Sequence, residues 1–218
     1  MAGSHIGENI ANALSEVKAN WSLPNIIAVT DNAANEKKAF EILKWIRFGC
    51  YGHRINLVVK NALSSSKEVT HVIAKGRKLV TFFHQSTSAS DVWLSKQLLV
   101  LKEEHAKHKL IMDVPTRWNS TVVMLRRLLE VSPAILALAS DPGDVLNKNA
   151  IATIKSLAFS FEEQTLVEQL VDVLSPFERA TAIVCADKSP TMHKVKPVIM
   201  KIGKSIALSD DDPVYKKD

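Results

Sequence analysis

Residues 25–57, NIIAVTDNAANEKKAFEILKWIRFGCYGHRINL, alternate between strand-like and helix-like patterns. The run at residues 25–30 is short, apolar and without polar alternation, and it stops at Asp31, which predicts a strand buried on both faces of a parallel or mixed sheet. Asp31 and Asn32 supply turn chemistry, and residues 33–45 then predict a helix. The inward-facing residues of that helix are expected to be Ala39, Phe40 and Leu43, with Ile46 as a further candidate.

The same alternation extends to both sides of this stretch. Residues 47–51 predict a second short strand, which is followed by a helical face at offsets 0, 3, 4, 7 and 8 made of Ile55, Val58, Val59, Ala62 and Leu63. Residues 8–21 predict an amphipathic helix that ends before Pro24, with one apolar face made of Ile10, Ala13, Leu14 and Val17. The N-terminal part of the chain therefore has an α/β pattern.

From about Ser66 onward the pattern is helical. A helical stripe is made of Val69, Val72, Ile73, Val80 and Phe83, and a break rich in Ser and Thr follows at residues 85–90. Further helices are predicted at residues 92–108, 120–131 and 161–184, the last bent or broken near Ser175-Pro176. The predicted fold class is mainly α with an α/β start.

Composition narrows the class of protein. Of the 218 residues, 46% are hydrophobic and 23% charged, a balance typical of a globular protein, and neither a membrane span nor a secretory signal is visible. The two cysteines, Cys50 and Cys185, lie far apart in sequence, which argues against a disulfide framework and fits a reducing compartment. The net charge of +5 permits nucleic-acid binding without demonstrating it.

Asp31 is the first candidate functional residue. An acid at the carboxyl end of a buried strand lies where α/β sheets usually present ligand-binding side chains, and its carboxylate suits a hard divalent metal ion. The alternative is that Asp31 only caps the following helix, and position alone favours that alternative because caps are far commoner than metal sites.

The second candidate is the segment CYGHRINL at residues 50–57. Cys50 and His53 have the spacing of half a zinc site, but no second close pair follows, because His71 and Cys185 are scattered. Taken by itself, the segment favours a buried cysteine beside a histidine that is hydrogen-bonded at a helix start.

The third candidate is the segment DVPTRWNST at residues 113–121, where Pro115 blocks a helix and Asn119 or Ser120 can cap the next one. Arg117 beside Trp118 places a phosphate-binding fork next to a stacking surface. The alternatives are that Trp118 is a core anchor and that the Arg126-Arg127 pair is a solvated face. Without further context these structural roles are commoner than DNA contact.

These blocks occur in a specific order. VTDNAAN (29–35), CxxHxxNL (50–57) and TRWNS (116–120) resemble, in sequence, the central blocks of hAT-superfamily DNA transposases, in particular the BED-zinc-finger group. Three further stretches resemble that family as well, namely GENIA (7–11), LSPFERAT (174–181) and SPT (189–191). The resemblance covers about residues 4 to 203.

The resemblance implies an RNase H-like core in which two Asp and one Glu bind two divalent ions, interrupted by a helical insertion domain. It divides the chain into a partial core with one catalytic-type Asp (1–65), the helical insertion domain (66–208) and an acidic tail (209–218). In this family Asp31 corresponds to the second, metal-binding acid. Cys50 and His53 match a motif that handles DNA ends rather than zinc.

The resemblance also implies roles in the helical domain. Trp118 would stack on a flipped base of hairpin DNA ends and Arg117 would steady the nearby phosphate, with Arg126 and Arg127 as further DNA contacts. The family's first Asp, final Glu, BED finger and dimerisation segment have no counterpart that we identify in residues 1–218. The first Asp of the family lies on a strand upstream of those predicted here, and without the initial strands the sheet would have an exposed edge that needs cover.

We therefore expect a fragment of a hAT transposase, or a domesticated protein derived from one, that binds duplex or hairpin DNA through its insertion domain. We expect no activity and no cofactor for this chain by itself, and Mg²⁺ or Mn²⁺ only with a complete site. Nuclear localisation and a homo-oligomeric full-length protein follow from the family, with no membrane partner. The alternatives are a non-catalytic protein-interaction scaffold and a metal-dependent nuclease completed by another chain.

Overall fold

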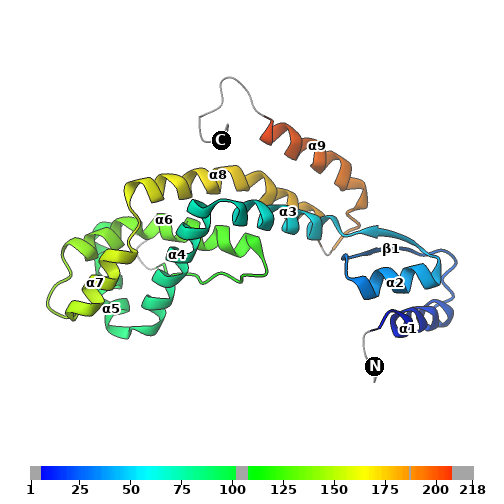
Figure 1. Ribbon diagram of the computed structural model, residues 1–218, viewed down its shortest axis with the longest axis horizontal. Coiled ribbons are helices and arrows are strands. Elements are labelled where there is room, and N and C mark those ends of the chain that lie inside the picture. The colour runs from blue at the N-terminus through cyan, green and yellow to red at the C-terminus, as the bar shows by residue number, and fades with distance from the viewer. Residues whose placement is uncertain (1–5, 102–107, 187, 208–218) are drawn as a thin grey trace.

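The structure is a computed structural model that describes residues 6–101, 108–186 and 188–207. A small α/β lobe at one end of the molecule consists of α1 (Gly7–Asn20), β1 (Ile27–Thr30), α2 (Ala34–Leu43) and β2 (Ile46–Gly49), as Figure 1 shows. The two strands pair in parallel, with Ile27 opposite Ile46 and Thr30 opposite Gly49. The predicted order of helix, strand, helix and strand is confirmed.

Helix α1 packs on α2 through small side chains. Gly7 and Ala11 of α1 are buried together with Ala39 and Phe40 of α2. A Cβ at Gly7 would lie 2.7 Å from Cβ of Lys38, so the close approach of the two helices requires glycine there. The expected apolar face of α1 is therefore only partly correct. Ile10, Ala13 and Leu14 are half-buried but Val17 is exposed, because the contact with α2 follows the small residues instead.

The prediction of a strand buried on both faces is wrong for this structure. Ile27, Val29, Ile46 and Phe48 are exposed, whereas the alternate residues of each strand are half-buried. Within the described residues only two strands form the sheet, and one face of it leaves these four apolar side chains exposed. Ile46 belongs to this open face rather than to the inward face of α2.

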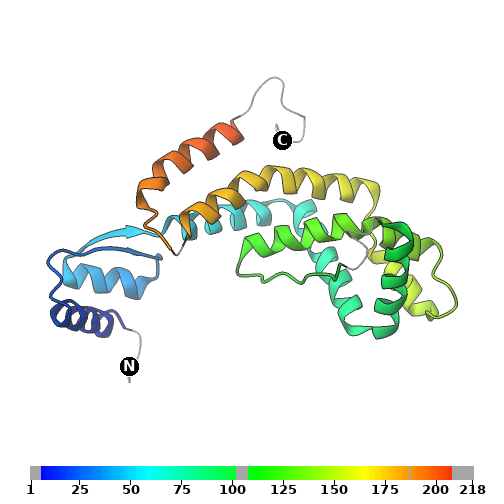
Figure 2. The same ribbon diagram turned by 180° about the vertical axis from the view of Figure 1, so that it is seen from behind.

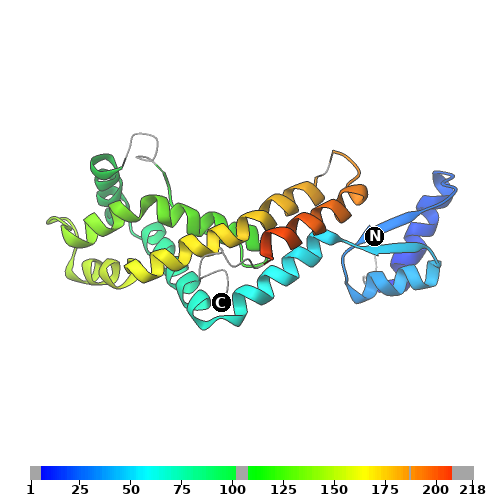
Figure 3. The same cartoon turned by 90° about the horizontal axis from the view of Figure 1, so that it is seen from above.

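The remaining described elements are helical, which confirms the mainly α character. They are α3 (Tyr51–Ser65), α4 (Lys67–Gln85), α5 (Thr87–Val100), α6 (Trp118–Ser140), α7 (Lys148–Leu157), α8 (Phe161–Val184), the 3-10 helix η2 (Met192–Lys194) and α9 (Val195–Ile206). Figures 2 and 3 show α3, α6 and α8 running alongside one another, with α9 folded back over α8. None of the helices in the described residues is long and apolar enough to cross a membrane.

Several helix boundaries differ from the sequence-based expectations. Helix α6 continues to Ser140 through Pro133, α8 is unbroken at Pro176, and α7 was not predicted. The break at residues 85–90 shrinks to Ser86, whose hydroxyl accepts the backbone N–H of Ala89 and so caps α5. Helix α5 ends at Val100, and both the remainder of the predicted helix at residues 102–107 and the acidic tail at 209–218 lie outside the described residues.

Two hydrophobic clusters hold the helices together. The larger one joins α4, α5, α6, α7 and the first half of α8 and includes Val72, Leu79, Val80, Phe83, Leu125 and Leu128. The smaller one, called here the junction cluster, joins α3, α6, α8 and α9 and consists of Ile55, Val59, Trp118, Val122, Leu174, Ala180, Val184, Val198 and Ile202. The junction cluster draws together three segments that the sequence had singled out, at residues 50–57, 116–120 and 174–181.

Candidate functional site

A direct contact joins the two most specific sequence segments. The backbone N–H of Trp118, the first residue of α6, donates a 3.4 Å hydrogen bond to Oδ1 of Asn56 on α3. The Trp118 side chain is 3% exposed and lies in the junction cluster with Ile55 and Val59. Residues 62 positions apart in sequence therefore meet at one point.

The start of α6 is built by its preceding loop rather than by a side-chain cap. The N-cap residue is Arg117, which makes no side-chain cap hydrogen bond, so the expectation that Asn119 or Ser120 caps this helix is wrong. Ser120 instead ties down the loop, because its Oγ accepts from the backbone N–H of Val114 (2.8 Å) and donates to the carbonyl of Arg117 (2.7 Å). This loop holds the Arg117 backbone beside α3.

An ion pair between a half-buried arginine and a buried aspartate also holds this loop in place. Arg77 of α4 donates to both carboxylate oxygens of Asp113, with Nη2 2.6 Å from Oδ2 and Nε 2.9 Å from Oδ1, and Thr121 Oγ1 donates to Oδ2 at 2.7 Å. The Asp113 side chain is 1% exposed. Burial raises its pKa, but the hydrogen bonds from Arg77 and Thr121 outweigh burial and hold the pKa below its usual value. Sequence reasoning did not anticipate this pair.

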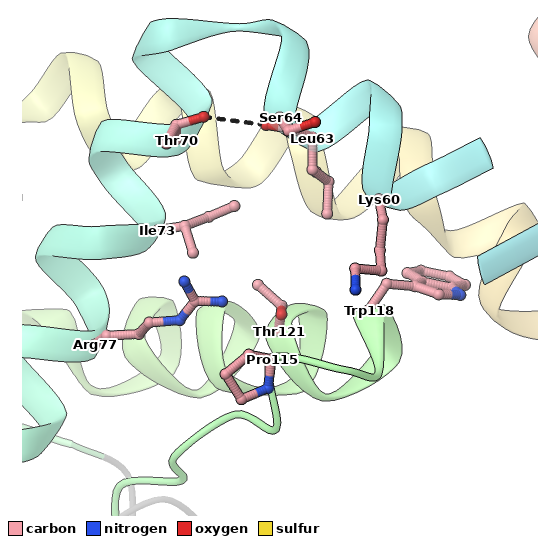
Figure 4. Close-up of a pocket in the computed structure, with 9 residues that line it drawn as sticks. All are labelled: Lys60, Leu63, Ser64, Thr70, Ile73, Arg77, Pro115, Trp118 and Thr121. Carbon is pink, nitrogen blue, oxygen red and sulfur yellow. Dashed lines mark hydrogen bonds between the residues drawn. The ribbon is translucent and has the colours of Figure 1, made fainter. Parts of the chain in front are cut away.

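A pocket of about 150 Å³ opens between α3, α4 and the start of α6 (Figure 4). Its lining consists of Lys60, Leu63, Ser64, Thr70, Ile73, Arg77, Pro115, Trp118 and Thr121. Figure 4 shows the Lys60 side chain extending toward Trp118 and Thr121. Lys60 is exposed and has no ion pair within the described residues, whereas Arg77 is already bound to Asp113. The sequence analysis had not singled out Lys60, although it lies on the same α3 face as His53 and Asn56.

Asp31 lies at the carboxyl end of β1, as expected, and organises the turn into α2. Its Oδ1 accepts the backbone N–H of Ala33 at 2.8 Å, one residue before the helix, while Ala33 is the N-cap and has no side-chain cap bond. Arg47 binds the same turn, since it donates to Thr30 Oγ1, to the Asp31 carbonyl and to Asn32 Oδ1. No group of three or more His, Cys, Asp or Glu side chains suited to a metal ion occurs in the described part of the chain.

Cys50 and His53 lie at the start of α3. Cys50 is the half-buried N-cap residue without a side-chain cap bond, and the half-buried His53 has no hydrogen bond from its ring within the described residues. The hydrogen-bonded histidine expected from the segment by itself is therefore not found. Cys185 is far from this segment in sequence but lies against Gly52, since a Cβ added at Gly52 would collide with Cys185 Sγ.

The three arginines have different surroundings. Arg117 is exposed, and its guanidinium makes no hydrogen bond or ion pair within the described residues. Arg126 forms an ion pair of 2.8 Å with Glu178 of α8, and Arg127 pairs with Glu130 at 2.9 Å. The charges of Arg126 and Arg127 are thus offset by neighbouring carboxylates, and of these three arginines Arg117 alone has a guanidinium without a partner in the part of the chain that the structure describes.

A larger hollow lies between the strand ends and the chain that leads into α9. This cavity of about 620 Å³ is lined by apolar residues of the open sheet face and α9, including Val29, Phe48 and Ile199, and by the cations Arg54 and Lys196. Cys50 and Val184 form part of its wall. Cys50 and the SPT stretch at residues 189–191 are the parts of this lining that the sequence analysis had singled out, whereas Arg54 and Lys196 were not.

Comparison with known proteins yields one family and several relatives. The family model described as the ZBED1 RNase-like helical domain matches residues 48–171. Human zinc finger BED domain-containing protein 4 is 27% identical over 184 residues, which cover 84% of this chain and 14% of that protein. Human zinc finger BED domain-containing protein 6 is 24% identical over 200 residues, which cover 88% of this chain and 18% of that protein.

A transposase relative extends the comparison to plants. A Zea mays protein whose name assigns it to the AC9 transposases is 27% identical over 184 residues, which cover 76% of this chain and 21% of that protein. The chain therefore spans about a seventh to about a fifth of the length of these relatives. The resemblance to hAT transposases and the BED-zinc-finger group is confirmed by these matches.

Proposed function

This chain belongs to the family of the ZBED1 RNase-like helical domain, and from that premise we propose that it is a transposase-derived DNA-binding element that contacts the phosphate backbone where α3 meets the start of α6. The observation that carries the proposal is the hydrogen bond between Asn56 and Trp118. It places the unpaired Arg117 next to α3, where His53 and Lys60 lie about one helical turn on either side of Asn56.

The chemistry of this group suits phosphate oxygens. A guanidinium offers a planar fork of donors, an ammonium offers a mobile point charge, and an imidazole adds a further donor. Because each neutralised phosphate releases condensed counterions, a contact to duplex DNA contributes a slope of about −0.9 to the logarithmic salt dependence of binding. Arg126 and Arg127 are weaker candidates for DNA contact, since binding DNA would require them to share or leave Glu178 and Glu130.

Trp118 enters the proposal as a positioning residue. With 3% of its surface exposed it cannot stack on a flipped base in this conformation, so a stacking role at hairpin ends requires its release from the junction cluster. In the conformation described, its packing and its backbone hydrogen bond fix the position of Arg117. A preference for hairpin over duplex DNA would be the sign that Trp118 is released on binding.

Fluorescence anisotropy of labelled duplex and hairpin DNA across a salt series tests the proposal. Arg117→Ala and Lys60→Ala are each expected to weaken binding to all sequences and to reduce the magnitude of the salt slope by about 1. Lys155→Ala is the matched control, since it removes an exposed lysine on α7, at the opposite end of the molecule from the α/β lobe (Figure 1). The proposal would be contradicted if Arg117→Ala and Lys60→Ala left DNA affinity unchanged, or if Lys155→Ala weakened binding as much as they do.

We further propose that the α/β lobe is part of an RNase H-like core and that the protein acts in the nucleus. The parallel strands joined by α2, the position of Asp31 at a strand end and the description of the family model support the first statement. Relatives named as BED zinc finger proteins, transposases and a transcriptional regulator support the second. Imaging of the full-length protein tagged at either end tests localisation.

A protein-interaction scaffold is the second candidate function, and the open sheet face favours it. Ile27, Val29, Ile46 and Phe48 form an exposed apolar surface of the kind that marks interaction sites. Phe48→Glu would then abolish recovery of a specific protein partner from cells while leaving DNA binding unchanged. Recovery of specific DNA without any protein partner would count against the scaffold.

A further inference from the structure

Cys50 and Cys185 are 135 positions apart in sequence, but the sulfur atoms of both lie close to Gly52. A Cβ at Gly52 would collide with Cys185 Sγ and lie 3.9 Å from Cys50 Sγ, so both sulfur atoms lie around the Gly52 α-carbon. Both thiols are free in this structure. Because Gly52 has no side chain, the Cys185 sulfur can occupy the space that a Cβ at this position would fill.

Each cysteine lies at a helix end. Cys50 is the N-cap of α3 and Cys185 is the C-cap of α8, so each is the residue that flanks its helix rather than one within it. The end residues of helices fray and adjust more readily than interior residues. A disulfide between the two sulfurs would therefore require small rotations of the two side chains and small shifts of the two helix ends.

We propose that Cys50 and Cys185 form a reversible thiol–disulfide pair that ties the start of α3 to the end of α8. The oxidant is a low-molecular-weight disulfide such as glutathione disulfide. One cysteine thiolate attacks that disulfide, forms a mixed disulfide and releases one glutathione. The second cysteine then attacks the protein sulfur, releases the second glutathione and closes the Cys50–Cys185 bond. Two thiols are oxidised, and one glutathione disulfide is reduced to two glutathiones.

The exposure of the two cysteines and the pKa of the Cys185 thiol indicate which thiol reacts first and how the rate depends on pH. Cys185 is exposed and Cys50 half-buried, so Cys185 is the sulfur that the oxidant reaches first. Burial and the neighbouring Cys50 raise the pKa of the Cys185 thiol, which lowers its thiolate fraction near neutral pH. The first step is therefore expected to accelerate as the pH rises.

The bond would act on the wall of the larger cavity. Cys50 and Val184, the neighbour of Cys185, both line the hollow between the strand ends and α9. The bond would also link the start of α3 to the end of α8, two helices that already meet in the junction cluster through Ile55 and Val184. The oxidised form is thus expected to hold the α/β lobe more rigidly against the helical part.

The test is peptide mapping by mass spectrometry under non-reducing conditions, after incubation of the chain with glutathione disulfide at low protein concentration. The expected result is a cross-linked peptide containing Cys50 and Cys185, loss of the mass of two hydrogen atoms, and full reversal by dithiothreitol. The melting temperature of the oxidised form should be higher, since a long loop is closed. Cys50→Ser and Cys185→Ser should each retain a glutathione adduct on the remaining cysteine.

Gly52→Ala supplies a second variant that keeps both thiols. Its new Cβ displaces Cys185 Sγ, so the cross-link should form at least several-fold more slowly, while circular dichroism verifies that the chain is folded. Stable glutathione adducts on both cysteines without a cross-link would overturn the proposal. A disulfide between two copies of the chain, in place of the internal one, would overturn it as well.

Discussion

Asn56 accepts the backbone N–H of Trp118 through its side-chain oxygen, across the interface between α3 and α6. The donor belongs to the first turn of α6, where backbone N–H groups have no partner within the helix. Asn56 therefore satisfies one of these groups from a different helix and, together with the loop that Ser120 ties down, it positions the start of α6. The same contact sets the position of Arg117, the residue on which the proposed DNA contact depends.

Replacement of Asn56 tests this relationship. Asn56→Ala removes the acceptor and leaves the Trp118 N–H without its partner, which is expected to lower the free energy of unfolding by about 1 kcal/mol. Asn56→Asp retains an acceptor oxygen and should lose less. Urea denaturation followed by circular dichroism measures both variants, and equal losses for the two would show that the acceptor has no part in the effect.

Trp118 is expected to dominate the stability of the junction cluster. Trp118→Ala deletes a large side chain that is 3% exposed, and large-to-small changes of this kind cost about 3–5 kcal/mol. Trp21→Ala is the matched control, because Trp21 is 76% exposed and its loss should change the free energy of unfolding little. If both variants have the same melting temperature as the parent chain, Trp118 does not anchor the junction cluster.

This prediction changes how a loss of DNA binding in Trp118→Ala should be interpreted. Because the variant is expected to be destabilised, weaker binding would follow from misplacement of Arg117 as well as from loss of a stacking surface. Arg117→Ala separates the two effects, since an exposed side chain without partners can be removed with little cost to folding.

Much of the fold was predictable from local patterns. The helix and strand order up to Ser66 follows from short apolar runs and helical spacing, and the range of α8 was predicted residue for residue as 161–184. The open face at Ile27 and Phe48 was not predictable in this way, since an apolar run reports the hydrophobicity of a strand and not whether another element covers it. Pro133 and Pro176 lie inside continuous helices because tertiary packing overrides their local preference.

Some residues of the candidate site could be proposed from the sequence, whereas Lys60, Arg77 and the geometry of the site could not. Sequence order and residue type identified Arg117, Trp118 and Cys50. Only the structure shows that Trp118 is buried, that Arg126 and Arg127 are paired, and that Cys185 adjoins Gly52. Contacts between residues so far apart depend on how helices pack, which periodicity within one helix does not report.

The Arg77–Asp113 pair predicts a pH dependence of stability. The pKa of Asp113 is lower in the folded chain than its usual value of about 3.9, so the unfolded chain binds the proton more tightly. The stabilisation is therefore fully present above about pH 4 and is lost as the pH falls through the lower, folded-state pKa. Thermal melting between neutral pH and about pH 3 should show this loss in the parent chain.

Asp113→Asn is the variant that isolates this contribution. It keeps the shape of the side chain but removes the titrating charge, so it should be less stable at neutral pH and should lose less stability on acidification. Asp144→Asn is the control, because it makes the same change at an exposed acid in the loop before α7. Parallel pH profiles for the parent chain and Asp113→Asn would show that another acid governs the transition.

Asp31 yields the last prediction, which separates its role in the turn from a role in metal binding. Asp31→Ala removes the acceptor for the Ala33 N–H and is expected to lower the melting temperature by about 2–4 °C, whereas Asp31→Asn keeps a side-chain oxygen and should lose less. A metal ion held by this chain would instead raise the melting temperature of the parent, because any ligand that binds only the folded state stabilises it. Since the described residues contain no cluster of three metal-binding side chains, millimolar Mg²⁺ or Mn²⁺ should leave all three melting temperatures unchanged. If Mn²⁺ raised the melting temperature of the parent chain but not that of Asp31→Asn, Asp31 would bind metal here. That result would favour the alternative of a metal-dependent nuclease completed by another chain.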